Sequence, residues 1–315
     1  MTRKLWVSLF TATVLASLST FSGQLLRAQV SGTISGFVTD PSGARIAEAM
    51  VTATLVRQNV SRTVPSNTEG FYNFPTLLPG IYTLTAEKAG FERLVQTEVT
   101  LTVGQNVRLD FALKLGSVTQ QVTVTGAAPI VDTRSATVSG LVDDRRIVDL
   151  PLNGRNVIEL ASILPGVLDV VAPQSLQGVT LGPRLDVNGG RPNMNQFVFD
   201  GGYFNNPSRN TGFNFPPPDA VQEFRLLTAD FSADTGRNSG SDMMVVTKSG
   251  TNEFHGSLWE FFRNDALNAR NFFSSSVPGI KENQFGAAAG GPVVRDKLFV
   301  YGSFQGLRNR PQAVG

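Results

Sequence analysis

Residues 184–203 read RLDVNGGRPNMNQFVFDGGY, and this stretch decides the fold class of the central part of the chain. Two short segments with alternating apolar residues, Leu185–Val187 and Phe197–Phe199, flank an Asn, Gly, Arg and Pro-rich connection that a helix cannot accommodate. We therefore predict a strand, a tight connection and a second strand. A third alternating segment, Val221–Leu227, follows a loop rich in Asn, Phe and Pro. The whole region is predicted to form a small mixed sheet with one elaborate loop.

Short motifs occur in a fixed order around this stretch, and their combination is far more specific than any one of them. They are LPLNGRN (150–156), NGGR (188–191), DG (200–201), EF (223–224), GRNSG (236–240), TKSGTN (247–252) and HGS (255–257). This set resembles the TonB-dependent outer-membrane receptors, and most closely the Oar-like subgroup with an N-terminal carboxypeptidase-regulatory-like domain. The resemblance implies a plug domain followed by a transmembrane β-barrel.

The composition predicts a mainly β protein that carries no covalent chemistry. With 31 Gly, 17 Pro and 22 Phe in 315 residues, strands and turns are favoured over helices. The net charge of +2 comes without a long basic run, so nucleic acid is not expected as a partner. The chain has no cysteine and one histidine, His255, and it lacks phosphate-loop and nucleophile-elbow motifs. We predict no catalytic, metal or cofactor site, and therefore no enzyme.

Residues 1–28 have the pattern of a secretory signal peptide. Arg3 and Lys4 precede an apolar run over Leu5–Leu18, and the segment ends in Leu26-Arg27-Ala28. The apolar run is shorter than the roughly 20 residues that a membrane-spanning helix needs, so an anchor helix is the weaker alternative. Cleavage is expected before Gln29.

Residues 29–115 alternate between turn signals and period-two segments, which predicts a β-sandwich of seven short strands. The predicted strands include 33–38, 50–56, 71–74, 81–86, 95–101 and 107–113. The region resembles the carboxypeptidase-regulatory-like domain, which has a carbohydrate-binding-like fold. Tyr72 and Tyr82 would stack on a sugar ring if they were exposed, although the same pattern favours their burial in the core.

Residues 116–131 form a linker with one strand-competent segment, Val122, Thr123, Val124 and Thr125. The resemblance implies a TonB box at this point, which pairs by strand addition with a periplasmic energising protein of the TonB type. The alternative is that these residues form the last strand of the sandwich or the first strand of the plug.

Residues 132–252 are predicted to be the α+β plug. Helices are expected over Asp143–Leu150 and Asn156–Leu164, because each segment ends at a proline. The resemblance implies that the loop over Tyr203–Pro218 faces the extracellular mouth of the barrel and contacts substrate; packing against the barrel is the alternative. The candidate contact residues are Tyr203, Phe204, Asn205, Asn206, Arg209, Phe213 and Phe215.

Residues 253–315 have longer aromatic-rich segments that are typical of the first strands of a transmembrane barrel. Plugged outer-membrane barrels have about 22 strands, and at ~10 residues per strand the 63 residues after Asn252 supply only about three. An open barrel edge is not tolerated in lipid. We therefore expect this chain to be part of a larger receptor.

The leading functional hypothesis is an outer-membrane receptor or transporter whose plug gates substrate uptake powered from the periplasmic side. Its expected partners are a TonB-type protein, outer-membrane lipid and an extracellular substrate such as a glycan or a siderophore-like molecule. The expected location is the bacterial outer membrane, with the sandwich and the TonB-box candidate on the periplasmic side. The alternative is an exported module that binds a carbohydrate or a surface polymer without transport.

Overall fold

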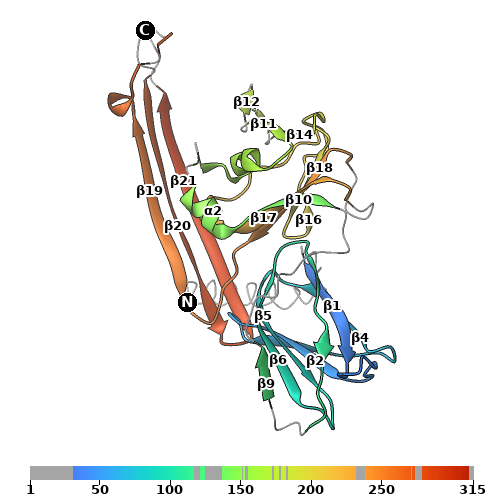
Figure 1. The fold of residues 1–315 in the computed structure, drawn as a ribbon. Helices are drawn as coiled ribbons and strands as arrows, with labels where there is room; N and C mark the ends of the chain where they lie inside the picture. Colours follow the sequence, from blue (N-terminus) through green and yellow to red (C-terminus); the bar gives the residue numbers. More distant parts are fainter. Residues whose placement is uncertain are drawn as a thin grey trace, which may run out of the picture.

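The computed structural model describes residues 31–116, 121–124, 137–150, 152, 155–171, 174–176, 179–181, 184–231, 238–270, 272–273 and 279–311. They form a β-sandwich, a middle part between residues 137 and 252 that we call the plug segment after its predicted role, and a long C-terminal sheet (Figure 1). The predicted signal peptide, residues 1–28, lies outside the described residues.

Two sheets face each other in the sandwich. The first contains β1 (Gly32–Thr39), β4 (Phe71–Leu77), β7 (Asn106–Arg108) and β8 (Phe111–Ala112). The second has the order β3-β2-β5-β6-β9, and its bounds are β2 (Met50–Leu55), β3 (Val60–Pro65), β5 (Gly80–Glu87), β6 (Arg93–Leu101) and β9 (Gln121–Val124). Burial alternates strictly along β1, so this strand contributes one apolar face to the core between the sheets. The largest side chains of that core include Tyr72, Phe74 and Phe111.

The predicted strand pattern and the observed one differ at two places. No strand was predicted over β3, whose residues are almost all exposed and which therefore lacks the apolar alternation that marks a strand. Instead, β3 is held by continuous pairing of its backbone with β2. The predicted strand over 107–113 is divided into β7 and β8, which are separate parallel partners of β1.

The plug segment is built on a mixed sheet of order β10-β17-β18-β15-β16. Its strands are β10 (Val138–Val142), β17 (Val221–Ala229), β18 (Ser241–Thr247), β15 (Asn195–Phe199) and β16 (Gly202–Tyr203). β15 runs parallel to β18, whereas β10, β17 and β18 are antiparallel neighbours. The strand β14 (Arg184–Val187), predicted next to β15, pairs instead with β11 (Val167–Val171). Between β11 and β14 in the chain, β12 (Gln174–Leu176) and β13 (Val179–Leu181) pair as antiparallel strands.

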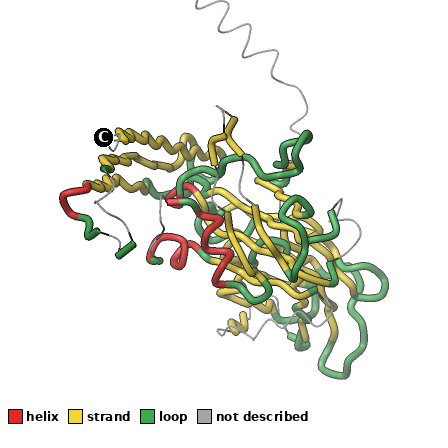
Figure 2. The backbone as a smooth tube through the Cα atoms, turned by 90° about the horizontal axis from the view of Figure 1, so that it is seen from above, coloured by secondary structure: helices red, strands yellow, loops and turns green. Residues whose placement is uncertain are grey.

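Both predicted helices are present in the plug segment. α2 (Asp144–Asp149) begins at Asp143, whose carboxylate accepts a hydrogen bond from the Arg146 N–H at 2.9 Å. The second, η2 (Val157–Ile163), is a 3₁₀ helix that begins at Asn156. Their buried side chains, among them Ile147, Ile158 and Leu160, pack on one face of the plug sheet. Figures 1 and 2 place these helical segments between the plug sheet and the C-terminal sheet.

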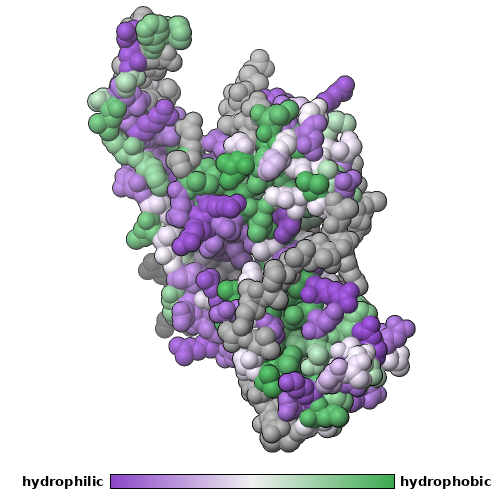
Figure 3. All heavy atoms as spheres, viewed as in Figure 1, coloured by the Kyte–Doolittle hydropathy of each residue, from purple (hydrophilic) through white to green (hydrophobic). Residues whose placement is uncertain are grey.

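The C-terminal sheet is an antiparallel meander of β19 (His255–Asn264), β20 (Ile280–Val294) and β21 (Leu298–Pro311). Its register places Leu258, Ala287 and Phe304 on one face and Trp259, Gly286 and Gln305 on the other. Leu258 is 86% exposed and Phe304 is 64% exposed, and apolar residues lie along these strands in Figure 3. Short 3₁₀ turns, η3 (Pro218–Ala220) and η4 (Asp265–Leu267), precede β17 and follow β19. In the part of the chain that the structure describes, no helix is both long and apolar enough to span a membrane.

Candidate functional site

The plug segment contacts the C-terminal sheet through Arg155, the arginine of the LPLNGRN motif. Its guanidinium lies 4.4 Å from the centre of the Phe261 ring and 5.4 Å from that of Trp259, so it stacks on two aromatic side chains of β19. The same guanidinium donates a hydrogen bond to the Asp219 carboxylate. Both charged side chains are largely buried, with 14% and 12% of their surfaces exposed. Because a charge of either sign is costly to bury alone, Arg155 and Asp219 depend on each other.

Asp219, in η3, connects the plug segment to two of the C-terminal strands. Its backbone carbonyl accepts a hydrogen bond from the Tyr301 hydroxyl of β21 at 2.8 Å. Its carboxylate also lies 3.4 Å from the Ser257 hydroxyl of β19, which donates to it. Burial lowers the pKa of Arg155, and the charge of Asp219 opposes this effect. Arg155, Asp219 and the aromatic side chains together form what we call the plug–sheet contact.

Sequence reasoning did not assign a role to Arg155 or to Asp219. Arg155 is part of a recognised motif, and its backbone has φ of 55°, a left-handed conformation that is uncommon for a residue other than glycine. Asp219 stands 64 residues farther along the chain. Nothing local in the sequence indicates that the two side chains meet.

The TonB-box candidate is located at the edge of the sandwich. Val122, Thr123 and Val124 lie in β9, which pairs in parallel with Leu94–Gln96 of β6. β9 is the last strand of its sheet, so its second edge has no partner strand among the described residues. This placement corresponds to the alternative that the sequence left open, a strand added to the sandwich. Thr125 lies outside the described residues.

The predicted substrate loop is held by an asparagine network beneath it. Asn205 is 3% exposed, accepts a hydrogen bond from the Phe197 N–H at 2.7 Å and donates to the Asn195 carbonyl at 2.8 Å. Asn210 donates to Asn238 at 2.9 Å and accepts from the Tyr203 hydroxyl at 3.1 Å. These bonds hold the loop in a defined conformation, and they use Asn205 as a structural residue.

The aromatic residues of that loop are divided between the core and the surface. Phe204 and Phe215 pack on the plug core and on each other, with ring centres 5.1 Å apart. Tyr203 and Phe213 are 45% and 44% exposed, and Arg209 is also exposed. Asn206 is half-buried and accepts from the Ser208 backbone and hydroxyl, as in a turn. The exposed candidates for substrate contact are therefore Tyr203, Arg209 and Phe213.

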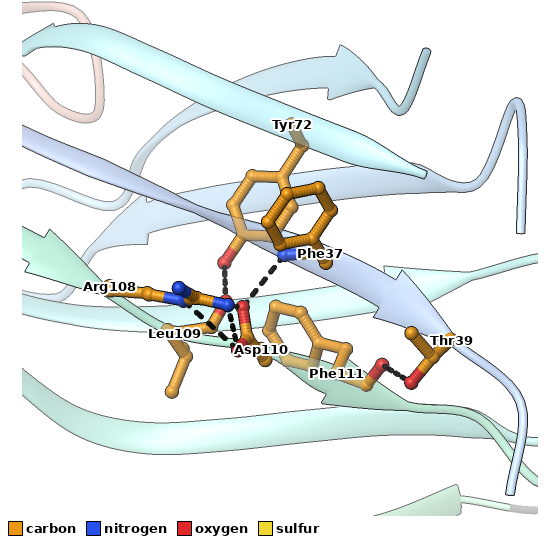
Figure 4. A network of polar contacts seen from close by, with 7 residues as sticks. All are labelled: Phe37, Thr39, Tyr72, Arg108, Leu109, Asp110 and Phe111. Atoms are coloured by element: carbon orange, nitrogen blue, oxygen red, sulfur yellow. Dashed lines mark hydrogen bonds and ion pairs between the residues drawn. The ribbon is translucent and has the colours of Figure 1, made fainter. Parts of the chain in front are cut away.

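The two tyrosines considered for sugar stacking lie inside the sandwich. Tyr72 is 1% exposed, and its hydroxyl donates to the Leu109 carbonyl at 2.6 Å (Figure 4). Tyr82 is 3% exposed and donates to the Leu78 carbonyl at 2.7 Å. Neither ring offers a face to a ligand. Within the described ranges, no three acidic, histidine or cysteine side chains are grouped so that they could hold a metal ion.

Comparison with known proteins gives two family matches and one long alignment. The Carboxypeptidase regulatory-like domain matches residues 33–114, and the Outer membrane beta barrel domain matches residues 246–315. The TonB-dependent transporter Oar of Myxococcus xanthus is 30% identical over 293 residues, which is 87% of this chain and 26% of that protein. The resemblance of this chain to the Oar-like TonB-dependent receptors is confirmed. The chain spans about a quarter of the length of this relative.

These matches also confirm the mainly β fold class and the location in the bacterial outer membrane. Two solved structures are similar to part of the chain. The siderophore receptor PirA from Acinetobacter baumannii is 22% identical and covers 53% of this chain and 24% of its own, with a TM-score of 0.41. The ferric enterobactin receptor PfeA is 18% identical with the same coverage of both chains, and its TM-score is 0.39.

Proposed function

We propose that this chain is the plug-bearing part of an outer-membrane receptor that transports a substrate, and that the plug occludes the barrel until it is displaced. The observation that carries the proposal is the plug–sheet contact. Arg155 and Asp219 attach the plug segment to one face of the β19–β21 sheet, while the other face exposes Leu258, Phe262 and Phe304. One face of the sheet then faces lipid, and the other faces a plug that fills the lumen.

The two ends of the plug sheet are suited to different partners. The loop network begins at Asn195, where β15 starts, whereas Asn252, just beyond the end of β18, donates to the Arg57 carbonyl of the sandwich at 3.1 Å. Because β15 and β18 are parallel, the loop and the sandwich lie at opposite ends of the sheet. This arrangement supports an extracellular role for the loop and a periplasmic position for the sandwich.

A periplasmic energising protein of the TonB type is the proposed partner of β9. β9 is the last strand of its sheet, and strand addition uses the backbone donors and acceptors of such an edge strand. The exposed side chains Tyr203, Arg209 and Phe213 are proposed to contact the substrate, because aromatic faces and one guanidinium suit a ligand with both apolar and anionic or hydroxyl groups. The alternative function, an exported sugar-binding module, has no support from Tyr72 and Tyr82, which are buried.

The occlusion is tested by conductance, which does not require the substrate to be known. The full-length receptor is inserted into planar lipid bilayers, and it is compared with a variant in which residues 137–247 are replaced by a short Gly/Ser linker. We expect small or no conductance from the intact receptor and a stable, large conductance from the deleted one. Equal conductance from the two proteins, with both inserted as barrels, would refute the plug assignment.

A further inference from the structure

One turn of the sandwich is inserted against the plug sheet. Val103, between β6 and β7, is completely buried, yet it is not part of the sandwich core. It packs instead with Val246 of β18, and the half-buried Leu141, Val198 and Met244 lie around this pair. The face of the plug sheet opposite the helices is therefore covered by a residue from the sandwich.

Polar groups around Val103 fix the position of this turn. The Glu223 carboxylate of β17 accepts a hydrogen bond from the Val103 N–H at 2.5 Å. Arg225, two residues along the same strand, donates to the Thr102 hydroxyl at 2.7 Å and to the Ser139 hydroxyl of β10 at 3.0 Å. One guanidinium thus connects the sandwich turn, β17 and β10.

A second group of contacts lies at the end of β18. The Gln58 amide of the sandwich donates to the Gly250 carbonyl at 2.8 Å and to the Ser249 hydroxyl at 3.2 Å. Gln58 is 7% exposed, so this contact excludes most water. The sandwich is therefore docked on the plug segment at two places, the Val103 turn and Gln58. A rotation of the sandwich about one contact would break the other.

One of the strands that the Val103 turn contacts is β10, the strand next to the linker. β10 is the first strand described after residues 125–136, it is an edge strand, and its partner in the sheet is β17. A pull along the linker would peel β10 from its start at Val138, one backbone hydrogen bond at a time. Edge strands of five residues resist peeling weakly. Leu141 of this strand packs against the Val103–Val246 pair, and Ser139 of this strand is connected to Thr102 by Arg225.

We propose that the sandwich is a latch on the plug. Its Thr102–Gln105 turn holds β10 in the plug sheet and determines the force on the linker that is needed to detach β10 from the sheet. The inference rests on the proposed function, because it assigns the sandwich a role in gating. Undocking of the turn removes the packing of Leu141 against the Val103–Val246 pair and the Arg225 bridge together, after which β10 is held by its pairing with β17 and by Val142 in the plug core.

Hydrogen exchange of the full-length receptor in detergent tests the latch, with peptides that cover residues 137–143. Val103→Ser removes the apolar contact, and Thr102→Val removes the hydroxyl that accepts from Arg225. We expect each variant to accelerate exchange in β10 about tenfold to a hundredfold, the factor expected for loss of one buried apolar group or one charge-assisted hydrogen bond. Peptides from β15 and β18 should be accelerated much less, because each of these strands stays paired with a neighbour on both sides.

Val60→Ser is the matched control, because Val60 begins the exposed strand β3 and is 43% exposed. It should leave β10 unchanged. Unchanged exchange in β10 for both interface variants would overturn the latch, and so would equal acceleration across β15, β17 and β18, since the turn would then support the plug as a whole. The conductance experiment above addresses occlusion separately, so the latch and the proposed function can fail independently.

Discussion

The guanidinium of Arg155 is largely buried, and its charge is compensated by the Asp219 carboxylate and by two aromatic rings. Arg155→Met keeps the length of the side chain and leaves the Asp219 carboxylate largely buried without its cation. We expect a loss of roughly 2–4 kcal/mol in the free energy of unfolding, since removal of one partner of a buried pair is strongly destabilising. Chemical denaturation of the full-length receptor, followed by protease susceptibility of the plug, measures this loss.

The double variant Arg155→Met/Asp219→Asn separates the ion pair from the packing. It should recover part of the lost stability, because no unpaired charge then remains in the contact. Arg209→Met is the control, since Arg209 is exposed on the loop. A loss for Arg155→Met no larger than that for Arg209→Met would show that the plug–sheet contact does not stabilise the receptor.

The buried carboxyl group of Asp242 should make the stability of the plug depend on pH. It is 1% exposed, its two carboxylate oxygens have no hydrogen-bond partner among the described residues, and burial raises its pKa to about 7. The folded plug therefore binds a proton that the unfolded chain releases at its ordinary pKa near 3.8, and stability falls as pH rises toward 7. From pH 5 to pH 8 we expect a decrease of roughly 2–3 kcal/mol from this residue.

Denaturation of the receptor at pH 5 and pH 8 measures this decrease, and Asp242→Asn should remove it while preserving the shape of the side chain. Glu223 is a second buried carboxyl whose pKa is raised to about 7, chiefly by burial. It acts in the same direction, so the asparagine variant should keep a smaller pH dependence, and Asp242→Asn/Glu223→Gln should lose it. A wild-type receptor that is more stable at pH 8 than at pH 5 would contradict the assignment.

At the scale of elements, β9 gives a prediction about the energising partner. Val124→Pro removes a backbone donor and fixes φ, so strand addition to β9 should fail. The sandwich should stay folded, because β9 is a strand of only four residues at the edge of its sheet. We expect binding of the purified periplasmic domain of a TonB-type protein to the full-length receptor to weaken at least tenfold.

Val60→Pro in β3, at the opposite edge of the same sheet, is the control for this experiment. It should leave binding of the periplasmic domain unchanged. Unchanged binding by the Val124→Pro receptor would place the TonB box elsewhere. Melting of the sandwich by the same substitution would favour a purely structural role for β9.

The elements that were predicted from the sequence are those whose signal is local. β14, β15 and β17 show apolar alternation, and the two helical segments end at prolines, so each is visible in a short window. β3 carries almost no buried residue and was missed. The pairing of β14 with β11, and not with its neighbour β15, depends on contacts between distant segments. The position of β9 was left open for the same reason, because a Val/Thr alternation does not identify its partner strand.

In the whole molecule, the contacts that our proposals use join the plug segment to the C-terminal sheet and to the sandwich. A short stretch of sequence does not reveal them. Arg155 and Asp219 meet across 64 residues, and Val103 meets Glu223 across 120. Of the loop residues chosen for their chemistry, Asn205 is buried in the plug and Phe204 packs against the plug core. The same polar and aromatic residue types occur in ligand-binding surfaces and in interiors whose polar groups are hydrogen-bonded. Only the fold shows which of the two a given residue belongs to.

The last prediction concerns whether the sandwich folds independently of the plug. Its two sheets enclose a continuous core from Ile34 to Leu113, and no plug residue that the structure describes belongs to it. We therefore expect residues 29–115, expressed alone, to fold as a soluble β-sandwich with a cooperative melting transition, even though β6 then becomes an edge strand in place of β9. Val103 would become exposed in this isolated domain. Val103→Ser should for that reason leave its melting temperature within about 2 °C of wild type, while the same substitution releases β10 in the full receptor. A random-coil spectrum for the isolated domain would show that the sandwich needs the plug to fold, and a large drop in its melting temperature with Val103→Ser would show that Val103 belongs to the sandwich core and not to the interface.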